Sequence, residues 1–70
     1  MRDAIEAFNQ GIDHMQNNEL EHAIEAFTRA IELDPELAVA HNGRGVAFAL
    51  IGDMNRGIAD CSEAIRLVPE

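Results

Sequence analysis

The stretch GIDHMQNNELEHAIEAFTRAIELDP, residues 11–35, decides the fold, because it returns in altered form as GVAFALIGDMNRGIADCSEAIRLVP, residues 45–69. Sliding the chain against itself by 34 residues gives eight identities in 36 aligned positions. Composition alone would give about three. The identical pairs are mostly small, aliphatic or helix-breaking residues: Ala4/Ala38, Gly11/Gly45, Ile24/Ile58, Ala30/Ala64, Ile31/Ile65, Leu33/Leu67, Pro35/Pro69 and Glu36/Glu70. We therefore predict a single domain, residues 1–70, built from two repeats at about 4–37 and 38–70.

Each repeat carries two stretches with the apolar periodicity of an α-helix. In the first repeat, apolar residues recur every three or four positions from Leu20 to Ile31, which places them in one stripe on a helix. The same stripe runs from Met54 to Ile65 in the second repeat, and a further apolar stripe precedes each of them. No segment alternates with a period of two, so we predict no strand. We predict helices near residues 4–17, 19–33, 35–51 and 53–67.

Residues that start and stop helices support these boundaries. Asp3 and Asn18 each precede a glutamate by three positions, which is the spacing of a capping box, so each is predicted to cap a helix. The Asp34-Pro35 dipeptide predicts an N-cap followed by proline at the first helical position, where the missing N–H costs nothing. The Gly52-Asp53 dipeptide predicts a helix that ends in glycine and a new helix that begins at an aspartate cap.

The residues at fixed places in the repeat resemble the tetratricopeptide repeat family, whose period is 34. The matches are the family's glycine, its second-helix alanine and phenylalanine, and its final proline: Gly11 and Gly45, Ala23, Phe27, and Pro35 and Pro69. At the family's tyrosine position this chain has a different ring-bearing residue in each repeat, His14 and Phe48. At the remaining signature positions the chain differs from the family pattern: Ala7, Gln10, His41, Arg44, Gly57 and Cys61. The resemblance covers residues 4–70, which is nearly the whole chain.

This resemblance implies an all-α fold, an α-solenoid of two helix-turn-helix repeats whose four antiparallel helices stack into a right-handed superhelix. It also implies that the first helix of each repeat lines a concave groove. We expect Gly11 and Gly45 to lie where paired helices approach most closely, because a side chain there would push the helices apart. Ala23 and Gly57 are the small residues expected to face them.

Charge and composition argue against several classes of partner. Thirteen acidic residues against five arginines give a net charge of −8, which repels phosphate and anionic lipid, so we expect neither nucleic acid nor a membrane as partner. With no run of 18 apolar residues and no apolar leader, the default expectation is a cytoplasmic location. Residues 1–37 carry nine acids and two arginines, whereas residues 38–70 carry four acids and three arginines. The acidity of the first repeat either keeps the chain soluble or steers a basic partner.

No pattern of reactive side chains indicates catalysis or metal binding. His14, His22, His41 and Cys61 contain no pair at a Cys-x₂-Cys or His-x₃-His spacing. We expect His14 and His41 to pack where the family has aromatic residues, and His22 to face solvent. The acidic residues of the second helix form a solvated face. We find no Ser/His/Asp pattern and no glycine-rich phosphate loop, so we predict no enzyme, no metal and no cofactor.

The first functional hypothesis is a protein-interaction module, a scaffold or adaptor that binds an apolar or amphipathic peptide in the concave groove. The groove positions implied by the resemblance are Ile5, Phe8, Asn9, Ile12, Met15, Gln16, Val39, Asn42, Gly43, Val46, Ala49 and Leu50. One subfamily grips the carboxylate of chaperone tails with lysine, arginine and asparagine at such positions. Here Phe8, Ile12 and Gly43 stand there, and the chain has no lysine, so we expect no carboxylate clamp.

The alternative hypothesis is self-association into homo-oligomers. Each repeat alone buries only part of its apolar surface, and about three repeats are usually needed for stability. The face that a following helix would cover consists of Ile58, Cys61, Ile65 and Val68. Another copy of the chain, or more of a longer chain, would have to cover it.

Overall fold

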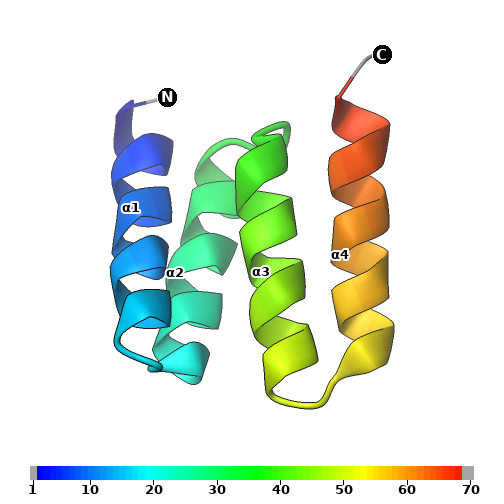
Figure 1. Cartoon of the computed structure of the whole chain (residues 1–70). Coiled ribbons are helices and arrows are strands. Elements are labelled where there is room, and N and C mark those ends of the chain that lie inside the picture. The colour runs from blue at the N-terminus through cyan, green and yellow to red at the C-terminus, as the bar shows by residue number, and fades with distance from the viewer. Residues whose placement is uncertain (1, 69–70) are drawn as a thin grey trace.

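The computed structural model describes residues 2–68 and shows four helices in one row (Figure 1). They are α1 (Arg2–Gln16), α2 (Leu20–Leu33), α3 (Ala38–Leu50) and α4 (Met54–Leu67). Each helix packs against the next along the chain, and α1 also touches α3, whereas α1 and α4 lie at opposite sides of the molecule. No strand occurs between residues 2 and 68. The predicted all-α fold of two helix-turn-helix units is therefore confirmed.

One phenylalanine and a set of small residues form the core. Phe27 on α2 is the one large side chain that is fully buried, and the other buried apolar residues in the described chain are alanines. A Cβ added at Gly11 would lie 2.5 Å from the Phe27 ring, and one added at Gly43 would lie 2.8 Å from it. The ring therefore fills the space between α1 and α3, and each of these helices must have glycine at the position that contacts the ring.

The second repeat places glycine against glycine. A Cβ on Gly45 would lie 2.9 Å from the carbonyl oxygen of Gly57, and a Cβ on Gly57 would lie 2.9 Å from the carbonyl oxygen of Gly45. The backbones of α3 and α4 thus meet directly. This confirms the predicted close approach at Gly45 with Gly57 facing it; at Gly11 the nearest atoms belong to the Phe27 ring and not to Ala23, the small residue predicted to face it.

Both repeats turn from their first to their second helix in the same way. Asn18 (φ 59°) and Gly52 (φ 96°) have positive φ and lie 34 positions apart. After α1, the amide of Glu19 donates to His14 O, and after α3 the amide of Asp53 donates to Phe48 O, at 2.8 and 2.9 Å. Each is the outer bond of a Schellman motif, and the inner bonds run from the amide of Asn18 to Met15 O and from the amide of Gly52 to Ala49 O, both at 3.0 Å.

Asn18 consequently ends α1 and does not begin α2, so the capping box predicted for it is wrong. The N-cap of α2 is Glu19, which makes no side-chain capping bond. The cap predicted at Asp53 is confirmed, since its carboxylate accepts from the amide of Arg56. Asp3 lies inside the first turn of α1 and is therefore not its N-cap.

The helix start predicted at Asp34-Pro35 is also wrong, because α3 begins at Ala38. The amide of Leu37 donates to Asp34 O at 3.1 Å, and the amide of Glu36 donates to the Asp34 carboxylate at 3.2 Å. Asp and Pro suit the first two positions of a β-turn as well as they suit a helix start. Here the turn is formed, and it joins the two repeats.

A half-buried arginine joins three helices. Arg44 on α3 donates two hydrogen bonds to Asp60 on α4, at 2.7 and 2.9 Å, and a third to Thr28 on α2 at 3.2 Å. Asp60 is 8% exposed, so this two-bond pair is largely shielded from water. Arg44 therefore fixes α3 and α4 relative to α2.

Candidate protein-interaction surface

Large apolar side chains remain open to solvent mainly along α3 and α4. Ten such residues are exposed in the described chain, and eight of them lie on these two helices or directly after them. The eight are Val39, Val46, Leu50, Ile51, Met54, Ile58, Ile65 and Val68. Ile65 is the most open of them at 75%. Exposed apolar side chains thus gather on this helix pair.

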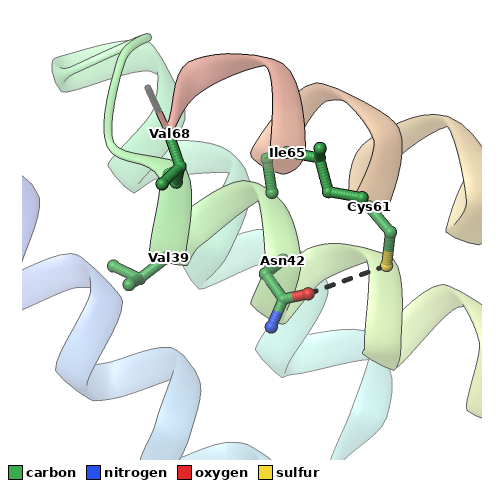
Figure 2. Close-up of a pocket in the computed structure, with 7 residues that line it drawn as sticks. Val39, Asn42, Cys61, Ile65 and Val68 are labelled. Atoms are coloured by element: carbon green, nitrogen blue, oxygen red, sulfur yellow. Dashed lines mark hydrogen bonds between the residues drawn. The ribbon is translucent and has the colours of Figure 1, made fainter. Parts of the chain in front are cut away.

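Two apolar hollows lie between the side chains of α3 and α4. The first, here the Asn42 hollow, has a volume of about 440 Å³ and is lined by Ala38, Val39, Asn42, Cys61, Ala64, Ile65 and Val68 (Figure 2). Its polar features are few: the Cys61 thiol donates to the Asn42 amide oxygen at 3.8 Å, which holds that side chain across the hollow. The hollow is therefore lined mainly by apolar side chains, with the amide of the exposed Asn42 as a hydrogen-bonding group.

The second hollow, here the Met54 hollow, has a volume of about 350 Å³. It is lined by Gly45, Val46, Ala49, Leu50, Met54, Gly57, Ile58, Cys61, Ser62 and Ile65. Cys61 and Ile65 line both hollows, so the two form one continuous surface along the helix pair. We refer to this as the α3/α4 surface.

The structure joins two sets of residues that the sequence treats separately. From the predicted groove, Val39, Asn42, Val46, Ala49 and Leu50 line these hollows. All four residues of the predicted self-association face, Ile58, Cys61, Ile65 and Val68, line the same hollows from α4. The α3 part of the groove and the self-association face are thus one surface.

The other groove residues lie elsewhere. Gly43 is turned toward Phe27. The Phe8 ring packs on Phe27 with 5.6 Å between ring centroids, and Ile12 and Met15 are half-buried. Ile5, Asn9 and Gln16 are exposed on α1. No α1 residue lines the Asn42 hollow or the Met54 hollow.

The first repeat shows what covers an equivalent surface. There Ala40 of α3 packs into a cluster with Ala30 and Ala7, and Leu37 and Ile31 lie against it. Translation by 34 residues carries Ala30 and Ile31 to Ala64 and Ile65, which border the Asn42 hollow. The exposed surface of the second repeat therefore corresponds to the surface that α3 covers in the first repeat.

Cys61 makes this second surface more hollow than the first. It stands 34 positions after Phe27, whose ring is 0% exposed beneath α3. A thiol fills much less space than a phenyl ring, and Cys61 is only partly buried. A helix that covered this surface would need a larger residue over Cys61 than Gly43, the residue of α3 that lies over Phe27.

The described part of the second repeat, residues 38–68, carries no net charge. Every charged residue between 38 and 68 lies in an ion pair: Arg44 with Asp60, Arg56 with Asp53, and Arg66 with Glu63. The hydrogen bond from Arg66 holds the pKa of Glu63 below its ordinary value and raises the pKa of Arg66. Residues 2–37 carry nine acids and two arginines. The α3/α4 surface thus lies within residues 38–68, where the acids and arginines balance.

The histidines do not assemble a metal site. Within residues 2–68 no three His, Cys, Asp or Glu side chains are placed to hold a metal ion. His14 pairs with Glu19 at 2.7 Å and stacks on His22 at 5.3 Å between ring centroids, a contact that the sequence analysis missed. His41 donates to Pro35 O at 2.8 Å, which anchors the turn before α3. In the described chain, no helix is long and apolar enough to cross a bilayer.

Comparisons with known proteins agree with this architecture. The chain is 34% identical over 58 residues to the NADPH oxidase activator of Dictyostelium discoideum, covering 83% of this chain and 10% of that protein. It is 36% identical over 53 residues to human small glutamine-rich tetratricopeptide repeat-containing protein beta, covering 76% and 17%. It is 31% identical over 67 residues to tetratricopeptide repeat protein 36 of Xenopus tropicalis, covering 96% and 33%.

The chain spans a third or less of the length of these relatives. A family profile described as TPR repeat matches residues 11–52, the stretch from the first close-approach glycine to the turn glycine of the second repeat. With the 34-residue period, the four helices and the glycine contacts, this match shows that the chain belongs to the tetratricopeptide repeat family.

Proposed function

We propose that this chain is a non-catalytic protein-interaction module, and that its α3/α4 surface binds an apolar or amphipathic helical segment of a protein in the cytoplasm. The observation that carries the proposal is the continuity of the two hollows through Cys61 and Ile65. Covering these aliphatic side chains would contribute roughly 25 cal/mol for each Å² removed from water. The names of two of the relatives, which are tetratricopeptide repeat proteins, support a role in binding proteins.

The α3/α4 surface is a better candidate than the groove shared by α1 and α3. On α1, the Phe8 ring is already packed on Phe27, and Ile12 and Met15 are half-buried. On α3 and α4, Leu50 and Ile58 are each 61% exposed. An apolar ligand therefore gains more contact on the second repeat.

The internal repeat supports a helix as the bound element. Helix α3 already covers the corresponding surface of the first repeat through Ala40 and Gly43. A bound helix in the same orientation would place a residue equivalent to Gly43 over Cys61, where there is unfilled space. We therefore expect the surface to prefer a helix with a bulky apolar residue at that position.

Titration calorimetry with two synthetic peptides tests this proposal. Both peptides have the sequence of residues 35–52 of this chain, and one carries Gly43→Leu. We expect the Gly43→Leu peptide to bind several-fold more tightly, with the negative heat-capacity change that accompanies apolar burial. The matched controls are Ile65→Lys in the protein, which should prevent binding, and Ile5→Lys on α1, which should leave it intact. Equal affinity of the two peptides, or loss of binding in Ile5→Lys alone, would contradict the proposal.

A further inference from the structure

We infer that the partner bound by the α3/α4 surface is a second copy of the chain, which presents the same surface, so that two chains join through their second repeats about a two-fold axis. This inference rests on the proposed function and names its partner. Three features of the molecule support it: the polar outer face of α1, the placement of charge, and the position of Ile65.

The polar face of α1 prevents copies from stacking head to tail. Where α3 presents the fully buried Ala40 and Ala47 to the first repeat, α1 carries Glu6 and Asp13, 34 positions earlier. Both acids are exposed in this chain. If α1 of one copy covered α4 of another, as α3 covers α2, it would bury the carboxylate of Asp13 and that of Glu6, which pairs with the exposed Arg2, and both would lose contact with water. An open chain of copies is therefore disfavoured. The α3/α4 surface of one copy is instead expected to contact the α3/α4 surface of another copy.

The charges fit a two-fold contact between second repeats. In such a contact each residue lies near its own counterpart, so an unpaired charge would face the same charge. The three ion pairs of residues 38–68 leave no unpaired charge on this half of the described chain. The acidic first repeat lies on the far side of the molecule from α4, so the two acidic halves would be kept apart (Figure 1).

The shape of the surface is also suited to self-contact. Ile65 projects from α4 with 75% of its surface exposed, next to the Asn42 hollow (Figure 2). A two-fold axis beside α4 allows Ile65 of each copy to enter the hollow of the other. The one cysteine of the chain, Cys61, lines that hollow and reports whether it is covered.

Sedimentation equilibrium over a wide dilution series tests the inference. We expect a monomer–dimer equilibrium with no larger species, and a melting temperature that rises with protein concentration. Ile65→Glu should give a monomer at every concentration with unchanged helix content, and Ile5→Glu on α1 should still dimerise. The dimer should persist or strengthen at high salt, because within residues 2–68 the unpaired charges are on the acidic first repeats.

Alkylation of Cys61 gives a second measurement that does not depend on a variant. The rate of its reaction with a maleimide should fall as the protein concentration rises. A monomer at all concentrations that still binds the Gly43→Leu peptide would overturn this inference and leave the proposed function standing. Assemblies that grow without limit, or a dimer lost in Ile5→Glu and kept in Ile65→Glu, would overturn the two-fold arrangement. Failure to bind either the peptide or a second copy would overturn both proposals.

Discussion

At the scale of single residues, Phe27 and the glycines around it set the distances between helices. The ring sits between Gly11 on α1 and Gly43 on α3, with no room for a Cβ at either position. The sequence predicted the close approach at Gly11 because the family's glycine stands there. The sequence-based prediction placed Gly43 in the groove instead. Gly43 and Phe27 belong to different repeats, so no local spacing in the sequence reveals their contact.

Gly11→Ala should destabilise the fold by about 1–3 kcal/mol, because the added methyl overlaps the Phe27 ring. This loss outweighs the gain in helix propensity of about 1 kcal/mol from replacing glycine. Urea unfolding measures the change. In the double variant Gly11→Ala/Phe27→Leu the smaller side chain makes room, so the total cost should be less than the sum of the single costs. Strict additivity would show that the two residues are not in contact.

The turn residues Asn18 and Gly52 give a second prediction at this scale. Both have positive φ, where a side chain is strained and glycine is not. Asn18→Gly should therefore raise the urea midpoint, whereas Gly52→Ala should cost about 1 kcal/mol although nothing lies near the added methyl. If Asn18→Gly lowered stability as much as Gly52→Ala, this would contradict the conclusion that both repeats form the same Schellman turn.

At the scale of helices, local patterns identified each element but not all of its ends. The 3.6-residue apolar stripes were sufficient to predict four helices. Asp34-Pro35 and Asn18 were wrongly predicted to begin helices, because the same residue types are common at helix starts, in turns and at helix ends. The contact of Arg44 with Asp60 was missed because the two residues are 16 positions apart on different helices. For the same reason, the α3 and α4 parts of the binding surface were predicted separately.

Arg44→Ala should destabilise the chain by about 2 kcal/mol, because it leaves the largely buried carboxylate of Asp60 without its two donors. Thermal or urea unfolding measures this. Arg44→Ala combined with Asp60→Ala should cost less than the sum of the two single changes. A free energy of unfolding equal to that of the unchanged chain would show that Arg44 does not join α2, α3 and α4.

The exposed pair of Arg66 and Glu63 on α4 is the matched control. Because the pKa of Glu63 is lowered in the folded chain, this pair stabilises the fold above the ordinary carboxyl pKa. That contribution is lost as the pH falls through the lowered pKa of Glu63. Arg66→Ala should leave the urea midpoint almost unchanged at neutral pH, since exposed pairs contribute little.

At the scale of the whole molecule, charge and apolar surface are separated. The first repeat holds nine acids and two arginines in residues 2–37, and the second repeat is neutral between residues 38 and 68 and holds the α3/α4 surface. The charge difference between the repeats could be predicted directly, because it follows from the number of acidic and basic residues in each. The continuous surface could not be predicted, because it depends on how α3 and α4 pack side by side.

This separation predicts that binding at the α3/α4 surface depends weakly on salt. Val46→Arg should weaken binding of the Gly43→Leu peptide by at least about tenfold, because it places a charge in the Met54 hollow while leaving helicity intact. Asn42→Ala should cost about 1 kcal/mol at most, since it removes one hydrogen-bonding group. Calorimetry at two salt concentrations checks this. A large loss of affinity at high salt would indicate that the ligand uses the acidic first repeat.

The most direct test of the account is a map of backbone amide shifts by NMR as the Gly43→Leu peptide is added to the protein. The account predicts that the largest shifts fall on α3 and α4 around the two hollows, with Asn42, Cys61 and Ile65 among them, and that the outer face of α1 is unchanged. Shifts concentrated on α1 around Ile5, Phe8 and Ile12, or spread evenly over both repeats, would contradict the claim that the α3/α4 surface is the binding site.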